Sequence, residues 1–188
     1  FLFCISFLPG FFIGSRECPG INRNLRGARP KRILSLTAPT TEILCLLGQE
    51  GLIVGLATGP CPARVRGLPK VARPFGNINL EAALGLKPDM AFCWPGASAV
   101  LRSFGIPTLT VKASTLQDVL SLVRKVGRIV GKAKAAQALI DSLRSRIRAV
   151  KRRVAGCSYK PLVYFESGSL GKTRGPGSLT HELIVAAG

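Results

Sequence analysis

Histidine is nearly absent from this chain, whose 188 residues contain only His181. With a single histidine to draw on, we expect no catalytic set in which a nucleophile, a histidine base and an acid act together. The six cysteines form no Cys-x-x-Cys pair, so the close ligand pairs of a zinc or iron–sulfur site are also missing. We therefore expect no catalytic residues, no enzyme activity and no metal site built by the protein itself.

Acidic residues are also scarce, with 9 Asp and Glu against 27 Lys and Arg and a net charge of +18. Such a balance indicates either a polyanionic partner or a solubilising basic surface. The charge is spread over many segments, which favours the second interpretation. Residues 124–153 are the exception, since they hold eleven Lys or Arg and one acid, Asp141. The alternative function is therefore a basic nucleic-acid-binding protein that uses a helix over 124–153.

A strongly apolar run occurs only at the start of the chain. Residues 1–15 are too short to span a membrane comfortably and resemble the hydrophobic region of a secretory signal. They predict export to a periplasmic or extracytoplasmic location; a hydrophobic strand or a wrong start site is the alternative. Glu17 stands where a lipidated Cys18 would need a small neighbour, so no lipid anchor is expected. Residues 16–31 lack periodicity and predict a linker.

Residues 32–131 predict one α/β lobe. Strands alternate with helices, which implies a parallel sheet with helices on both faces. Open parallel sheets bind ligands beyond the carboxyl ends of their strands, which points to the loops at 37–41, 57–67 and 93–97. The expected strands are Arg32–Leu36, Leu52–Leu56, a minor one near Val71, Met90–Phe92 and Thr108–Val111; the expected helices include Thr41–Leu47 and one capped by Ser114 or Thr115.

A longer helix is predicted over Lys132–Val154, with an apolar stripe on one side and basic residues opposite. At its rise per residue it spans about 33 Å, enough to cross a whole lobe. A strand at Pro161–Phe165 and a helix over Ser178–Ala187 are expected to follow. A lone strand–helix unit cannot bury its own faces. We therefore expect residues 132–155 to link the first lobe to the start of a second, truncated lobe at 156–188.

Several segments carry a family resemblance: RILSLTAPTTEIL from Arg32, GLPKV from Gly67, NLE from Asn79, the Lys87-Pro88-Asp89 turn, and GPGS from Gly175. Together they resemble the class III periplasmic substrate-binding proteins of ABC importers, which handle vitamin B12, haem and ferric siderophores. Within that group the vitamin B12-binding proteins look most similar, chiefly through the run from Lys87 to Trp94.

The resemblance implies two α/β lobes tied by a long helix, with the ligand in the cleft between them. The ligand would be cobalamin, haem or a ferric siderophore, so any metal would enter with it and the protein needs no cofactor. The expected partner is an ABC permease. The protein is expected to be a monomer and to bind no nucleic acid. Contact with the membrane is expected only through that permease or an uncleaved N-terminal segment. Glu81 matches the family's first-lobe docking glutamate; its alternative role is to favour the dipole of its helix.

Trp94 is the first candidate for ligand binding, because it directly follows a predicted strand. Its indole suits stacking on a flat chelate, or else it plugs the end of the lobe. Thr37 and Pro39 lie in the loop before the helix predicted from Thr41, whose N-terminus can face a polar ligand edge. Thr40 and Thr41 are expected mainly to cap that helix.

Arg64, Arg66 and Arg73 lie in or beside the second loop of the lobe. They can pair with acidic groups of a ligand, or remain solvated. The same loop has Gly59-Pro60-Cys61-Pro62 where relatives place an aromatic residue. This departure argues against assigning cobalamin specifically.

Overall fold

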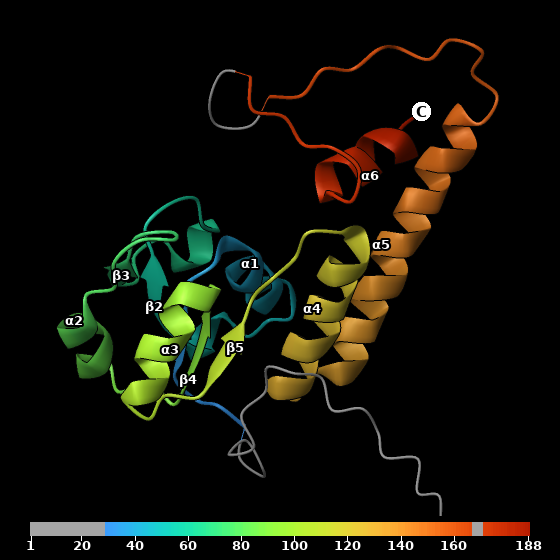
Figure 1. Cartoon of the computed structure of the whole chain (residues 1–188). Coiled ribbons are helices and arrows are strands. Elements are labelled where there is room, and N and C mark those ends of the chain that lie inside the picture. Colours follow the sequence, from blue (N-terminus) through green and yellow to red (C-terminus); the bar gives the residue numbers. More distant parts are fainter. Residues whose placement is uncertain (1–28, 167–170) are drawn as a thin grey trace, which may run out of the picture.

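The structure is a computed structural model that describes residues 29–166 and 171–188, so the signal-like segment and most of the predicted linker lie outside the described residues. It contains a parallel sheet flanked by helices, a long helical hairpin and a C-terminal helix (Figure 1). In chain order the elements are β1 (Ile33–Ser35), α1 (Ala38–Leu46), η2 (Glu50–Leu52), β2 (Ile53–Ala57), η3 (Ala63–Val65), β3 (Lys70–Ala72), α2 (Leu80–Gly85), β4 (Met90–Cys93), α3 (Pro95–Ser103), β5 (Thr108–Thr110), α4 (Leu116–Ile129), α5 (Ala133–Val154) and α6 (Leu179–Ala186).

The sheet has five strands in the order β3-β2-β1-β4-β5, and all neighbours pair in parallel. The predicted parallel α/β lobe is therefore confirmed, including the minor strand near Val71. The chain first builds outward from β1 to β2 and β3, then returns to add β4 and β5 on the other side. This reversal makes the gap between β1 and β4 a topological switch point, where the loops that follow the two strands diverge.

Helices cover both faces of the sheet, as its parallel topology requires. Ile33 points into the core shared with α1, α4 and α5, whereas its neighbour Leu34 points into the core shared with α2 and α3. Both side chains are fully buried. Apart from its last residue, Ser35, strand β1 is thus apolar, because neither of its faces meets water.

The start of α1 differs from the prediction. The helix begins at Ala38 rather than Thr41, since Pro39 fits the first turn of a helix without losing a hydrogen bond. Thr40 and Thr41 therefore lie inside the helix, and the prediction that they cap it was wrong. For α4 the predicted cap is confirmed: Thr115 Oγ1 accepts from the backbone N–H of Asp118 at 3.1 Å, while Asp118 Oδ2 accepts from that of Thr115 at 3.0 Å.

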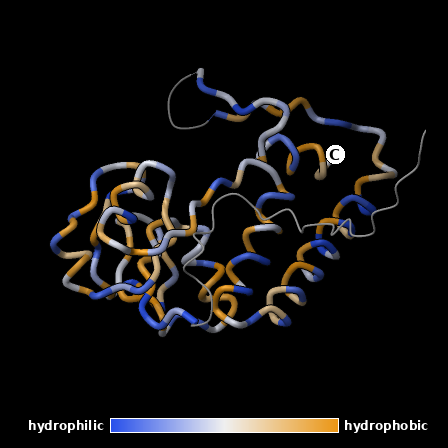
Figure 2. The backbone as a smooth tube through the Cα atoms, turned by 60° about the horizontal axis from the view of Figure 1, so that its bottom comes forward, coloured by the Kyte–Doolittle hydropathy of each residue, from blue (hydrophilic) through white to orange (hydrophobic). Residues whose placement is uncertain are grey.

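The predicted long helix is confirmed as α5, which has 22 residues and packs antiparallel to α4. Figure 2 shows hydrophobic and hydrophilic residues alternating along both helices. The two helices approach closely at Gly127, where an added Cβ would overlap the Cβ of Ala136. Helix α6 reaches the same hairpin, since the backbone N–H of Leu116 donates to Glu182 Oε2 at 2.6 Å.

The strand predicted at Pro161–Phe165 is wrong. The segment crosses from α5 to α6 as an extended, exposed chain, and its end makes only one isolated bridge, between Glu166 and Thr173 (Figure 1). Apolar and β-branched residues favour a strand, but a strand also needs a neighbour for its backbone hydrogen bonds. No described strand lies beside this segment, so Leu162 and Tyr164 stay exposed.

Replacing Gly127 by Ala tests the close packing of α4 on α5. Alanine is the better helix former by about 1 kcal/mol, but its methyl group would displace Ala136. We expect a net loss of about 1–3 kcal/mol in the free energy of unfolding, measured by urea denaturation. The control is Gly85→Ala in α2, where an added Cβ meets nothing within 4 Å; this variant should gain about 0.4–1 kcal/mol. Equal effects of the two changes would contradict the packing argument.

Candidate ligand-binding site

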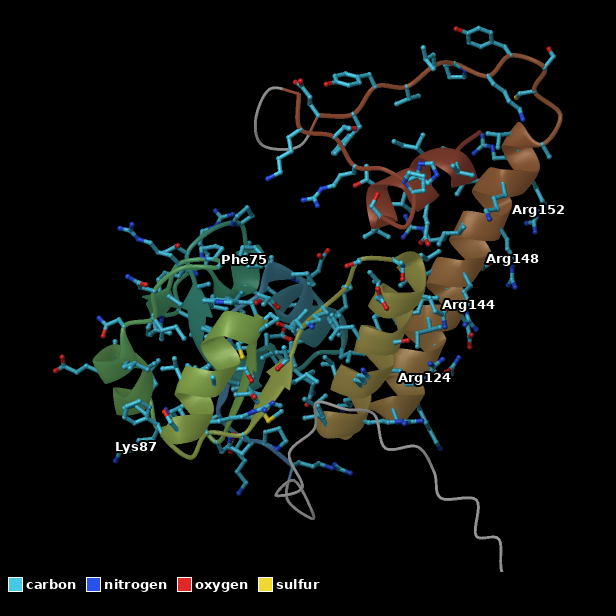
Figure 3. All side chains as sticks on the ribbon, in the orientation of Figure 1. Phe75, Lys87, Arg124, Arg144, Arg148 and Arg152 are labelled. Atoms are coloured by element: carbon cyan, nitrogen blue, oxygen red, sulfur yellow. The ribbon has the colours of Figure 1, made fainter. Side chains whose placement is uncertain are left out.

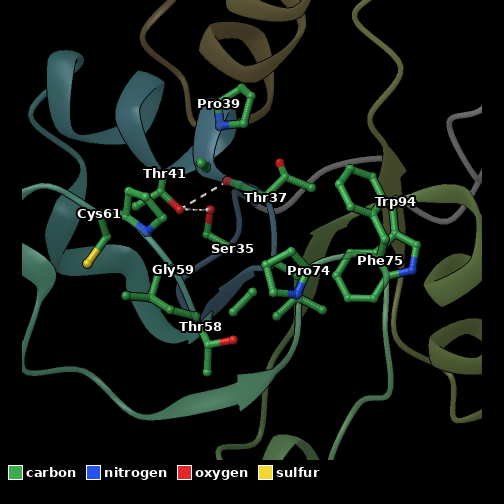
Figure 4. A pocket seen from close by; sticks show the side chains of 15 residues that line it. Ser35, Thr37, Pro39, Thr41, Thr58, Gly59, Cys61, Pro74, Phe75 and Trp94 are labelled. Carbon is green, nitrogen blue, oxygen red and sulfur yellow. Dashed lines mark hydrogen bonds between the residues drawn. The ribbon is translucent and has the colours of Figure 1, made fainter. Parts of the chain in front are cut away.

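A pocket of about 260 Å³ lies at the carboxyl edge of the sheet (Figure 4). Its walls come from the ends of four strands: residues 35–39 and Thr41 after β1, residues 56–61 at the end of β2, Pro74 and Phe75 after β3, and Trp94 after β4. The backbone N–H of Leu36 donates to the carbonyl of Phe92 at 2.8 Å, which holds the ends of β1 and β4 together. The pocket thus occupies the crevice that the switch point creates.

Two aromatic rings form one wall of the pocket. Trp94 is 6% exposed and lies under Phe75, which is 84% exposed; their ring centroids are 6.1 Å apart and the planes are inclined by 50° (Figure 4). This tilted arrangement is a favourable one for aromatic pairs. Trp94 therefore fills the end of the lobe and also lines the pocket. The two interpretations of Trp94 from the sequence, packing at the end of the lobe and contact with a ligand, are compatible.

Phe75 is a site residue that sequence reasoning missed. Its φ is +55°, a backbone conformation that bulky residues rarely adopt. Strain of this kind, together with an exposed ring, is typical of residues held for binding rather than for stability. The available signal was weak: an aromatic residue between Pro74 and Gly76, three positions beyond the end of β3.

The floor of the pocket beside β1 carries hydroxyl groups that bind one another. Ser35 Oγ shares hydrogen bonds with Thr40 Oγ1 at 3.0 Å and Thr41 Oγ1 at 2.8 Å. Thr40 and Thr41 also donate to the carbonyl of Thr37 at 2.9 and 3.1 Å. Most of this polarity is satisfied internally, and Pro39 adds an apolar edge. Thr37 and Pro39 both line the pocket; Thr37 is half-buried, whereas Thr58, the lining threonine after β2, is exposed.

The three candidate arginines are not brought to this pocket. Arg64 pairs with Glu50, with 3.3 Å between Nη1 and Oε1. Arg73 lines a separate, shallow depression beside β3, and Arg66 is exposed and lines neither hollow. The walls of the main pocket therefore hold no cationic side chain.

Two thiols lie at different depths in the same region. Cys61 is half-buried on the pocket wall, with Lys70 Nζ 3.5 Å from its Sγ. Cys93 ends β4 beneath Trp94, and burial raises its pKa to about 11. Burial also raises the pKa of Cys45, helped by the nearby carboxylate of Glu50. The described cysteines 45, 61, 93 and 157 are all free.

Glu81 lies in the first turn of α2 and is exposed. The cap of this helix is Asn79, whose Oδ1 accepts from the backbone N–H of Ala82 at 3.0 Å. Among residues 29–166 and 171–188, no ion pair or side-chain hydrogen bond engages the carboxylate of Glu81. It is therefore accessible to a partner.

Two kinds of feature were not found in the described part of the chain. No group of three or more His, Cys, Asp or Glu side chains there lies close enough to hold a metal ion. None of the described helices is long and apolar enough to cross a membrane.

A parallel-sheet lobe with a crevice at its switch point, followed by one long helix, defines an α/β binding-protein architecture. Residues 33–188 match the family model of the periplasmic binding proteins, and the chain belongs to this family. The fold is that of class III periplasmic binding proteins, as the sequence predicted.

Individual relatives support the same assignment. An uncharacterized ABC transporter substrate-binding lipoprotein of Bacillus subtilis is 29% identical over 133 residues, covering 66% of this chain and 42% of the relative. A cobalamin-binding protein of Halobacterium salinarum is 29% identical over 170 residues, covering 86% of this chain and 46% of the relative. A solved periplasmic heme-binding protein from Pseudomonas aeruginosa is 26% identical with a TM-score of 0.62, covering 67% of this chain and 47% of that one. The chain thus spans about half the length of the curated relatives it matches.

Alkylation rates of the cysteines test the geometry of the pocket. We expect iodoacetamide at pH 8 to modify Cys61 and the exposed Cys157 while Cys93 stays intact. A thiol whose pKa is near 11 is ionised in only about one molecule in a thousand at that pH, and burial blocks access as well. Peptide mass spectrometry after timed labelling measures each rate. Labelling of Cys93 as fast as Cys157 would contradict a closed strand end beneath Trp94.

Proposed function

We propose that this chain belongs to the substrate-binding component of an ABC importer and that its pocket binds one face of a bulky metal chelate. The observation that carries the proposal is the Trp94–Phe75 wall at the switch point of the sheet. Flat aromatic side chains bury large area at little entropic cost, which suits a planar macrocycle. No catalysis is proposed, and the metal would arrive inside the ligand.

The size and polarity of the pocket narrow the ligand class. Its 260 Å³ is below the range of about 300–1,000 Å³ that encloses a whole drug-sized ligand. It would therefore cover only part of a larger molecule, with the rest held by a second lobe. The absence of arginines from its described walls disfavours a ligand that presents acidic groups to this lobe. A corrin or porphyrin face fits better than a charged siderophore, which agrees with the cobalamin and heme named for two of the relatives.

The proposed function also implies a division of the chain into lobes. We infer that residues 32–131 form the first lobe, that residues 132–155 form the helical tie and that residues 156–188 begin the second lobe. The protein would act outside the cytoplasm as a monomer and deliver its ligand to a membrane permease. Glu81 is the proposed docking residue, because it is exposed and its helix is already capped by Asn79.

Replacing Phe75 by Ala tests the aromatic wall. Stacking against one aromatic ring contributes about 0.5–1.5 kcal/mol beyond area burial, so we expect affinity for cyanocobalamin or haemin to fall roughly two- to tenfold. Because Phe75 is almost fully exposed, the stability of the protein should hardly change. Titration followed by Trp94 fluorescence gives the affinity, and urea denaturation gives the stability.

Phe104→Ala is the matched control, since Phe104 is also exposed (51%) but does not line the pocket. It should leave ligand affinity unchanged. If neither cyanocobalamin, haemin nor a ferric siderophore binds the unaltered protein, the proposed ligand class is wrong. If a ligand binds but Phe75→Ala and Phe104→Ala change its affinity equally, the proposed ligand class is retained and the proposed role of the aromatic wall is wrong.

Charge reversal at Glu81 tests the docking role. The family resemblance implies that arginines of the permease face this glutamate. We expect Glu81→Lys to weaken binding to the permease at least about tenfold, since like charges brought together at an interface cost several kcal/mol. Ligand affinity should stay the same. Glu42→Lys is the control, because Glu42 is an exposed glutamate on a different helix, α1. Ligand uptake into proteoliposomes that carry the permease measures the effect, and equal losses in both variants would argue against a specific docking residue.

A further inference from the structure

The outer side of α5 carries a row of basic side chains. Arg144, Arg148 and Arg152 follow one another at intervals of four residues and are all exposed (Figure 3). Residues at this spacing share one helix face, and each step advances about 6 Å along the axis. Lys151, also exposed, belongs to the same face. We call Arg144, Arg148, Lys151 and Arg152 the basic row.

The basic row has no acidic partner among the described residues. The one ion pair among the described residues joins Arg64 to Glu50 in the sheet lobe, away from α5. Asp141 is the single acid of α5, and its Oδ1 instead accepts a hydrogen bond from Gln137 at 2.9 Å. Basic residues in the last turn also favour the helix dipole, which accounts for Lys151 and Arg152. That effect falls off within one turn, so it does not explain Arg144 and Arg148.

We propose that the basic row is an electrostatic contact surface for an anionic phospholipid bilayer. The apolar stripe of α5 packs against α4 and α6, and the row lies on the exposed remainder of the helix. Residues 124–153 contain no aromatic side chain on which bases could stack, which disfavours single-stranded nucleic acid. The choice of a bilayer over nucleic acid rests on the proposed role beside a membrane importer.

The position of the row relative to the pocket fits this partner. In Figure 3 the labelled arginines of α5 lie along one edge of the molecule, well separated from Phe75 at the pocket wall. A bilayer bound through α5 would therefore leave the pocket open to ligand. This contact would keep the protein near the membrane between deliveries, without the docking of Glu81 to the permease.

The test compares binding of the full chain to vesicles of phosphatidylglycerol mixed with phosphatidylcholine and to vesicles of phosphatidylcholine alone, by co-sedimentation. One basic residue near an anionic surface changes partitioning roughly fivefold. The variant R144Q/R148Q/R152Q should therefore bind the anionic vesicles roughly a hundredfold more weakly, and salt should weaken binding of the unaltered chain. Glutamine keeps the helix propensity of α5 nearly unchanged.

A matched control removes the same charge elsewhere. The variant K31Q/K87Q/K112Q also lowers the formal net charge from +18 to +15, at exposed lysines outside α5. It should retain most of the vesicle binding. Equal losses in the two triple variants would mean that only net charge matters, and would overturn the proposal.

Two further outcomes would also overturn it. Equal, salt-insensitive binding to neutral vesicles would point to insertion of the apolar N-terminal residues instead of the basic row. Tight binding of a DNA duplex that is lost in R144Q/R148Q/R152Q, without vesicle binding, would assign the row to nucleic acid. None of these results depends on whether cyanocobalamin or haemin binds, so the failure of this proposal and of the proposed function can be told apart.

Discussion

The burial of β1 on both faces and along both edges is the constraint on which the rest of the structure depends. Its two neighbours in the sheet are β2 and β4, and its side chains alternate between two cores. A strand in this position must be apolar or, as at Ser35, have its polar group hydrogen-bonded internally, and its chain leaves the sheet at the carboxyl end. The segment after β1 must therefore turn away where β4 also ends. The crevice beside Thr37 and Trp94 is a consequence of that topology and needs no special sequence of its own.

What the sequence could predict followed from local pattern. Buried strands, the apolar stripe of α5 and the Thr115 cap are each encoded within a few residues, so composition and spacing are sufficient. The prediction that Trp94 lies at the pocket also needed little more than its place after a strand. Phe75 could not be predicted in this way, because its ring meets Trp94 through a turn with positive φ, and the two residues come from different strand ends.

The arginine candidates and the Pro161–Phe165 segment show what local sequence pattern could not predict. A basic residue in a loop indicates charge but not direction, and Arg64 pairs with Glu50 instead of facing the pocket. Residues 161–165 have the composition of a strand, but strand formation depends on a neighbour that composition does not specify. In both cases the missing information is the identity of the partner, which is a property of the tertiary structure.

Helix α5 also shows that burial depends on the tertiary partner as well as on the sequence pattern. Its apolar stripe is continuous in sequence, yet its burial is not: Ala136 and Ile140 are fully buried against α4, whereas Val150 is 44% exposed. Between α4, α5 and α6 lies a mainly apolar hollow of about 440 Å³, whose α5 side is formed by Leu143, Ile147, Val150 and Arg146. The first turns of α5 are thus packed against α4, and its later turns carry the same apolar pattern with more exposure. This pattern fits the proposed tie between two lobes, because such a tie would offer an apolar face to a different partner at each end while its outer face stays charged.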